Sequence, residues 1–203
     1  MAEITAVNHH ADHPGFAGPG GLLFAIVLLL VGRPNARLAV ELAEVSGADR
    51  VIDIGCGAGV AVRAAARRGA RATGVDPAPV MLRVARLVTR GGRTVDWAQG
   101  SAERVPAPDA SATVLWSLAT VHHWKDVHAG LAEAHRVLEP GGRLLAIERR
   151  TERDATGLAS HGWTGEQAKS FASQCRAAGF ADVGLTQHGQ GRRGVWAVRG
   201  VRR

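Results

Sequence analysis

The sequence is short of cysteine, of lysine and of long hydrophobic runs, and each shortage excludes a class of protein. Two cysteines in 203 residues, Cys56 and Cys175, cannot form a disulfide framework, so we predict a reducing, intracellular compartment. The apolar run at residues 22–31 is shorter than the ~20 residues of a membrane span. No lysine or arginine precedes it, unlike in a secretory signal peptide. We therefore expect a buried helix at 22–31, no transmembrane segment and a cytoplasmic location.

Positive charge comes almost entirely from arginine, because Lys125 and Lys169 are the only lysines while the net charge is +7. The preference for arginine over lysine, together with abundant Ala, Gly and Val, is typical of GC-rich coding sequences and fits an actinobacterial source. The arginines are spread along the chain, with the largest local excess at residues 192–203. Scattered charge predicts a solvated basic surface, and nucleic acid is not expected as a partner.

From Arg50 onward, short apolar strands alternate with helical segments. Such alternation predicts an α/β domain with a parallel, doubly wound sheet, and 203 residues suit one domain. The last two strands have no helix between them and should pair antiparallel. We expect strands at 51–54, 71–75, 94–97, 112–117, 143–148, 183–188 and 195–199, and helices at 34–47, 58–68, 78–90, from Asp126 onward and at 164–178.

A glycine-rich turn, V-I-D-I-G-C-G-A-G at residues 51–59, follows the first strand and opens a helix. Gly55 and Gly57 allow a sharp turn and close approach of the backbone to a ligand. Asp76 ends the second strand, at the spacing of the carboxylate that binds ribose hydroxyls in nucleotide-binding α/β folds. Asp53 would repel a pyrophosphate, whereas it would attract the ammonium group of a bound amino acid.

Five segments in the same order resemble class I S-adenosylmethionine (SAM)-dependent methyltransferases, in the methyltransferase type 11-like group of ubiquinone and sugar O-methyltransferases. The resemblance implies a Rossmann-like α/β fold with a seven-stranded, mostly parallel sheet, an antiparallel last strand, helices on both faces, and SAM as co-substrate. It divides the chain into an N-terminal cap over the acceptor pocket (1–47), a SAM-binding core (48–150) and a C-terminal helix with a β-hairpin (151–203). The five segments are D-I-G-C-G-A-G at 53–59, G-V-D-P at 74–77, G-S-A-E-R-V-P at 100–106, P-D-A-S-A-T-V-L-W-S-L-A-T-V-H-H-W at 108–124 and R-V-L-E-P-G-G-R-L-L at 136–145.

The same resemblance assigns the cofactor-binding residues position by position. Two positions depart from the family, which usually has Asp at Ser101 and an acid at Thr113. The first departure implies a weaker hold on the adenine amine, and the second removes an acceptor of a structural hydrogen bond. The residues implied to bind SAM are Asp53, Gly55 and Gly57 at its methionine part, Asp76 at the ribose, Pro77, Met81, Ser101 and Ala102 around the adenine, and Ser117 at the end of the fourth strand.

Three residues beyond the fourth and fifth strands are candidates for catalysis. His122 and His123 lie in the loop after strand four, where ligands of open α/β sheets bind. Either histidine could act as the general base for a hydroxyl acceptor, and we favour His122. Glu148 ends the neighbouring strand and could orient the base, as in the histidine–carboxylate dyads of sugar O-methyltransferases. The alternative is a packed and a solvated histidine, with Glu148 paired to Arg149 or Arg150.

The N-terminal arm carries a second group of polar residues, His9, His10, Asp12 and His13. These side chains could fold over the acceptor pocket, bind a metal, or form a polar arm. Their spacing matches no recognised ligand set on a defined helix, so we predict no metal site.

Three functions are compatible with these motifs. The leading one is O-methylation of a small hydroxylated acceptor such as a sugar or short oligosaccharide, for example by a mycobacterial methylmannose-polysaccharide O-methyltransferase. The second is methylation of a quinone or lipid, and the third is non-catalytic binding of SAM or nucleic acid. The connection at 149–163 is too short for a separate cap domain. The pocket must therefore be roofed by the N-terminal arm and helices or by another subunit, which makes a homodimer one expected arrangement.

Overall fold

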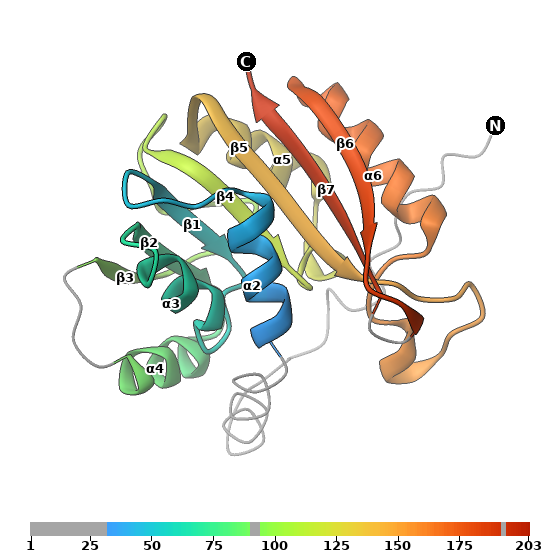
Figure 1. Cartoon of the computed structure of the whole chain (residues 1–203), viewed down its shortest axis with the longest axis horizontal. Helices are drawn as coiled ribbons and strands as arrows, with labels where there is room; N and C mark the ends of the chain where they lie inside the picture. The colour runs from blue at the N-terminus through green and yellow to red at the C-terminus, as the bar shows by residue number, and fades with distance from the viewer. Residues whose placement is uncertain (1–31, 90–93, 192–193) are drawn as a thin grey trace.

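The computed structural model describes residues 32–89, 94–191 and 194–203 (Figure 1). The helix expected at 22–31 and the histidine-rich arm lie outside these residues. Within the described part of the chain, no helix is long and apolar enough to cross a membrane.

A single seven-stranded sheet forms the centre of the molecule, in the order β3-β2-β1-β4-β5-β7-β6. The first five strands pair parallel with their neighbours, while β7 pairs antiparallel with both β5 and β6. The predicted mostly parallel sheet with an antiparallel last strand is therefore confirmed. The strands are β1 (Arg50–Ile54), β2 (Arg71–Asp76), β3 (Val95–Gln99), β4 (Ala112–Leu118), β5 (Leu138–Arg149), β6 (Phe180–His188) and β7 (Val195–Arg202).

Helices cover both faces of this sheet (Figure 1). Two of them begin where the sequence predicts, at side chains that accept from free backbone N–H groups. Asp126 accepts from the backbone N–H of Ala129 at 3.0 Å. Thr164 and Gln167 form a reciprocal capping box. The helices are α2 (Arg33–Leu42), α3 (Val60–Ala66), α4 (Pro79–Val88), α5 (Val127–Val137) and α6 (Gly165–Ala177), with short 3-10 turns η1 (Val121–His123) and η2 (Gly157–Ser160).

The alternation of side chains along each strand divides the core into two layers. In β5, Leu144 and Ala146 face one layer, and Leu145 and Ile147 face the other. Leu131 of α5 and other residues of α5 and α6 complete the first layer, while residues of α2 and α3 complete the second. Because both faces are covered, the central strands are apolar on both sides, as expected of a parallel sheet.

Several element boundaries differ from the prediction: β6 begins at Phe180 instead of residue 183, β7 ends at Arg202 instead of residue 199, and α3 is shorter than the predicted helix at 58–68. Two further differences have a backbone cause. The turn expected before the fifth strand is a bulge inside β5, which starts at Leu138 and shifts its register between the pairs with Ala112 and Val114. Gly141, with φ +81°, takes up the extra chain. Helix α2 ends at Leu42 instead of near residue 47, because Glu44 has left-handed backbone (φ 50°).

The resembling family usually has an acid at position 113, and Thr113 makes the structural hydrogen bond that this acid would accept. Its hydroxyl accepts from the backbone N–H of Arg50 at 2.9 Å and donates to Oδ1 of Asp49 at 2.7 Å. Asp49 is buried, which alone would raise its pKa. Hydrogen bonds from Ser46 and Thr113 and the charge of Arg143 instead hold the pKa below its usual range. The Thr113 hydroxyl thus accepts the structural hydrogen bond, and the Asp49 carboxylate that it contacts carries the negative charge.

Candidate active site

The glycine loop turns sharply between β1 and α3, at the carboxyl edge of the sheet. Gly55, Gly57 and Gly59 have φ of +70°, +51° and +75°, which other residues rarely adopt. A Cβ at Gly55 would lie 2.6 Å from the side chain of Thr120, in the turn after β4. Thr120 in turn donates to the carbonyl of Ile54 at 3.0 Å. The loop is therefore held close to the end of β4, and a side chain at Gly55 would not fit.

Asp76 joins the end of β2 to this loop. Its Oδ2 accepts from the backbone N–H of Gly57 at 2.8 Å, and its Oδ1 accepts from that of Ala78 at 2.9 Å. Burial raises the pKa of Asp76, and these two hydrogen bonds oppose the rise. Each carboxylate oxygen has a second lone pair, so Asp76 can also accept from ribose hydroxyls.

Asp53 is a buried carboxylate at the end of β1, with 2% of its surface exposed. Among the described residues, none makes a hydrogen bond of good geometry with its Oδ2. Burial and the nearby charge of Asp76 raise the pKa of Asp53 well above its usual range, and a contact with the Trp116 side chain only partly offsets this rise. A buried carboxylate with an unused oxygen beside a glycine loop fits the ammonium group of the methionine part of SAM.

The residues assigned to the adenine differ in exposure. Pro77 is exposed, whereas Met81 is buried among Ala58 and Val84. Ala102 is buried and Ser101 is half-buried. Met81 and Ala102 thus pack in the core, while Pro77 and Ser101 have side-chain surface that a ligand could contact.

Glu103 is a contributor to this region that sequence reasoning did not single out. Its Oε1 accepts from the backbone N–H of Lys125 at 2.7 Å and from that of Asp126 at 3.2 Å. Burial would raise its pKa, but hydrogen bonds from the Ser101 side chain and from these N–H groups lower it. Glu103 thereby connects the segment 100–106 to the loop that carries the histidines. The only sequence signal for this contact is the position of Glu103 within G-S-A-E-R-V-P.

The structure brings His122 and Glu148 together at the ends of β4 and β5. Nδ1 of His122 lies 2.9 Å from Oε2 of Glu148, and the backbone N–H of His122 donates to Oε1 at 3.4 Å. The Glu148 side chain is fully buried, and 12% of the His122 side chain is exposed. Ser117, assigned to SAM, is also buried, with its hydroxyl 2.5 Å from that of Thr120.

Two more imidazoles lie beside His122. The ring centre of His123 is 4.1 Å from that of His122, and the ring centre of His161 is 5.5 Å from it. His161 follows η2 and is 39 residues away in the chain, so no local pattern connects it to the other two. The sequence prediction missed it for that reason.

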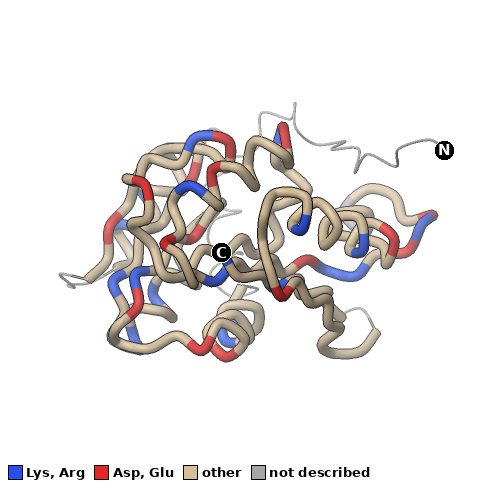
Figure 2. The backbone as a smooth tube through the Cα atoms, turned by 90° about the horizontal axis from the view of Figure 1, so that it is seen from above, with Lys and Arg blue, Asp and Glu red and all other residues tan. Residues whose placement is uncertain are grey.

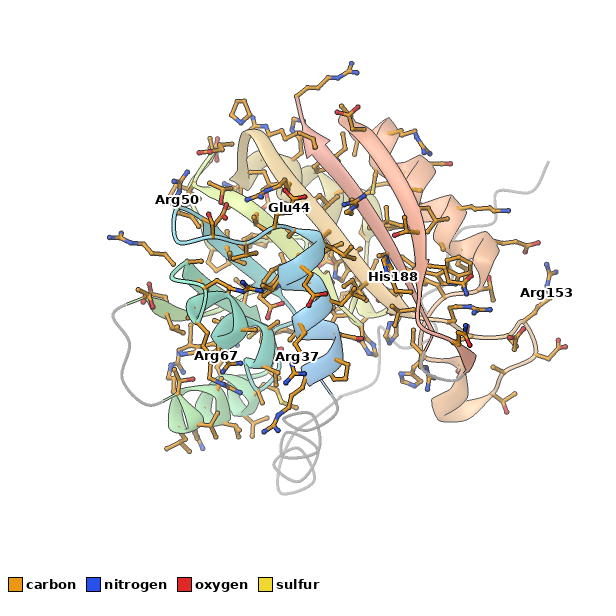
Figure 3. The ribbon with its side chains drawn as sticks, viewed as in Figure 1. Arg37, Glu44, Arg50, Arg67, Arg153 and His188 are labelled. Atoms are coloured by element: carbon orange, nitrogen blue, oxygen red, sulfur yellow. The ribbon has the colours of Figure 1, made fainter. Side chains whose placement is uncertain are left out.

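The scattered arginines gather in one place that the sequence did not predict. A cavity of about 640 Å³ between α2 and α3 is lined by arginines from both helices, and Arg37 and Arg67 are labelled in Figure 3. Burial and the charge of Arg67 lower the pKa of Arg63. Elsewhere, charges of both signs are interspersed along the chain (Figure 2). None of the residues assigned to SAM or catalysis lines this cavity, whose arginines are Arg33, Arg37, Arg63, Arg67 and Arg68.

Comparison with known proteins shows what the central part of the chain is similar to. Residues 52–146 match the family model described as "Methyltransferase domain". The chain is 38% identical over 117 residues to a ubiquinone/menaquinone biosynthesis C-methyltransferase of Rubrivivax gelatinosus, covering 57% of this chain and 45% of that protein. It is 31% identical over 118 residues to a ubiquinone biosynthesis O-methyltransferase of Maricaulis maris, covering 56% and 46%. The chain thus spans about half the length of these relatives.

A solved structure supports the fold over a larger part of the chain. A SAM-dependent methyltransferase from Aquifex aeolicus superposes with a TM-score of 0.75, at 17% identity, over 90% of this chain and 98% of that one. At this identity the likeness shows the fold. The glycine loop, Asp53 and Asp76 lie within the matched segment 52–146.

Proposed function

We propose that this chain, which carries a class I SAM-dependent methyltransferase domain, transfers the methyl group of SAM to a hydroxyl oxygen of a small acceptor. The observation that supports an oxygen acceptor is the contact of His122 with the buried Glu148, at the carboxyl ends of β4 and β5. SAM, when bound, supplies a methyl group on a positively charged sulfur. The residues of the chain then have to hold SAM, align the acceptor and remove one proton.

Three features of the chain would hold SAM. Asp53 would bind the ammonium group, and the turn at Gly55 and Gly57 would let the backbone approach the ligand. Asp76 would accept hydrogen bonds from the ribose while still holding the loop through Gly57 and Ala78. Since Asp76 binds both ligand and loop, it couples the shape of the loop to binding.

His122 would take the acceptor proton. A carboxylate accepts hydrogen bonds but has none to donate, so the contact with Glu148 places the ring proton of His122 on Nδ1. The other nitrogen, Nε2, then has a free lone pair, and no described residue hydrogen-bonds to it. On accepting a proton, the imidazolium would be stabilised by the charge of Glu148. General base catalysis of this kind contributes ~10²–10⁴-fold.

Two chemical classes of acceptor, sugars and quinols, are candidates. A sugar hydroxyl suits the dyad, but the relatives reported above bear the names of ubiquinone and menaquinone methyltransferases. Those names favour a second candidate, a quinol, whose ring hydroxyl the same base could deprotonate. The apolar run at 22–31 would suit such an acceptor.

One assay tests the activity and separates these acceptors. The purified chain is incubated with SAM and with short-tailed quinols, simple phenols, monosaccharides or mannose oligosaccharides, and formation of S-adenosylhomocysteine is measured. Turnover with a hydroxylated compound supports the proposal. No turnover with any of them, together with nucleic-acid affinity that falls steeply with salt, would favour the non-catalytic function.

SAM binding should release a proton from the protein, because Asp53 starts with a raised pKa. The ammonium group of SAM stabilises the carboxylate and lowers that pKa again, so the bound state holds fewer protons. SAM affinity should therefore rise with pH between the two pKa values, with a release of up to about one proton. Calorimetry in buffers of different ionisation enthalpy measures the release, and Asp53→Asn should abolish it. Equal release by the variant would show that another group titrates.

Deleting residues 1–20 should reduce acceptor turnover more than SAM affinity. The motifs that bind SAM all lie after Arg50, whereas the acceptor pocket needs a roof that the core does not supply. Turnover, SAM affinity and thermal stability are measured on the deleted and full chains. Equal loss of all three would place the arm in the folding core, and unchanged turnover would favour a roof from a second copy of the chain.

A further inference from the structure

Three histidines from two distant segments meet beside the proposed base. His122 and His123 come from η1, and His161 follows η2. One ring nitrogen from each can be chosen so that all three lie within 4.8 Å of one another. Among the described residues, this is the one group of histidine, cysteine or carboxylate side chains with such spacing.

The contact of His122 with Glu148 leaves Nε2 as the ring nitrogen of His122 that could bind a metal ion. Metal-bound histidines commonly donate their second ring N–H to a carboxylate, which fixes the tautomer and makes the ligand nitrogen more basic. His122 has this arrangement, with Nδ1 at 2.9 Å from Oε2 of the buried Glu148. Its Nε2 is buried, and no described residue hydrogen-bonds to it.

The position of His161 is fixed by hydrogen bonds to Arg149 at the end of β5. Arg149 donates through Nε to the carbonyl of His161 at 3.0 Å, and the N–H of Trp163 donates to the carbonyl of Arg149 at 2.8 Å. Between them, Gly162 has φ +137°, and a Cβ there would lie 2.2 Å from the Arg149 carbonyl oxygen. The chain can follow this path only with glycine at 162, so His161 is held next to the residue that follows Glu148.

The geometry points to a binding site for one divalent transition-metal ion, such as Zn²⁺, at His122, His123 and His161. Three imidazoles are a known ligand set for zinc and leave a fourth position for water or an acceptor oxygen. Zn–N distances of about 2.0–2.1 Å put tetrahedral ligands about 3.4 Å apart, so rotation of the rings would have to bring the nitrogens up to about 1.4 Å closer than their present 4.8 Å.

Metal binding and base catalysis use the same lone pair on Nε2 of His122. This inference therefore rests on the proposed function in one respect, since a bound ion blocks the base. Zn²⁺ should inhibit methyl transfer, and a chelator should restore it. The ion and the proton compete for one nitrogen, so the site makes the proposed activity sensitive to free metal.

Zn²⁺ titrated into the metal-free full chain tests the site. The variant His9→Ala/His10→Ala/His13→Ala is the background, because it removes the other histidine-rich segment. Calorimetry should give one ion per chain, and Co²⁺ should develop the visible absorption of a tetrahedral complex. Glu148→Gln should weaken Zn²⁺ binding by ~10–100-fold. His161→Ala should weaken it at least as much, and His128→Ala, at an exposed position on α5, should leave it unchanged.

The outcomes separate this inference from the proposed function. His161→Ala keeps His122 and Glu148, so it should lose Zn²⁺ inhibition while keeping turnover without metal. Equal Zn²⁺ binding by wild type and His161→Ala overturns the site, whatever the turnover. Activation by Zn²⁺ overturns the blocking of the base. Tight, His161-dependent binding by a chain without turnover supports the site and counts against the proposed function.

Discussion

Replacing His122 with alanine should lower turnover by ~10²–10⁴-fold while SAM affinity stays nearly unchanged. The imidazole is the proposed proton acceptor, and none of its described contacts is with a residue assigned to SAM. The loss should therefore fall on kcat with the hydroxylated acceptor. Steady-state kinetics and calorimetric SAM titration, both on metal-free protein, measure the two effects separately.

Stability has to be followed in the same experiment, because His122→Ala leaves the buried Glu148 carboxylate without its partner. Leaving a buried charged acceptor without its hydrogen-bond donor costs about 1–3 kcal/mol or more. The double variant His122→Ala/Glu148→Gln removes the stranded charge and should recover stability without recovering turnover. Recovery of both would mean that His122 acts by stabilising the fold.

Two further variants decide which residue is the base. Glu148→Gln should cost less turnover than His122→Ala, because it misorients the base without removing it. His123→Ala is the matched neighbour and should retain activity without added metal. Loss in His123→Ala with near-full activity in His122→Ala would move the assignment by one residue. Activity in both would leave proximity as the source of catalysis.

The arrangement of the sheet could be predicted because it follows from short-range patterns. Apolar strands alternate with helices from Arg50 onward, and side chains of one strand alternate between two core layers. The glycine loop and Asp76 were also predictable, since the ends of neighbouring parallel strands lie at one edge of the sheet. The contact of His122 with Glu148 followed from the same rule, because β4 and β5 are neighbours.

Features that depend on contacts between distant segments could not be predicted from the sequence. His161 approaches His122 only because Arg149 and Gly162 bend the chain back along β5. The arginines of α2 and α3 are scattered in sequence and line one cavity in space. The bulge in β5 depends on its register with β4, so the local sequence around Gly141 reads as an ordinary turn. In each case the missing information is the packing of a partner segment.

Asp76→Ala should weaken SAM binding by ~10²–10⁴-fold. Two hydrogen bonds from ribose hydroxyls to a charged acceptor are worth ~1.5–3 kcal/mol each, and 1.4 kcal/mol is tenfold in Kd. The substitution also leaves the N–H groups of Gly57 and Ala78 without their acceptors, at 2.8 and 2.9 Å in the native protein. The loop then loses its fixed shape, so the loss of affinity should lie at the upper end of that range.

Comparison with Asp76→Asn separates the contributions of ligand and loop. An amide has one acceptor oxygen, so asparagine can keep one of the two loop hydrogen bonds and has to give up the other. Affinity for SAM, measured by calorimetry, should fall for both variants and further for alanine. Asp96→Ala, at an exposed position on β3, should bind SAM as the wild type does.

Thermal unfolding shows whether the loop or the whole fold has changed. Burial raises the pKa of Asp76, which means that the buried carboxylate lowers the free energy of unfolding of the native protein. Both variants remove this charge, so neither should unfold at a much lower temperature. Unchanged SAM affinity in Asp76→Ala would remove the ribose site from this edge of the sheet.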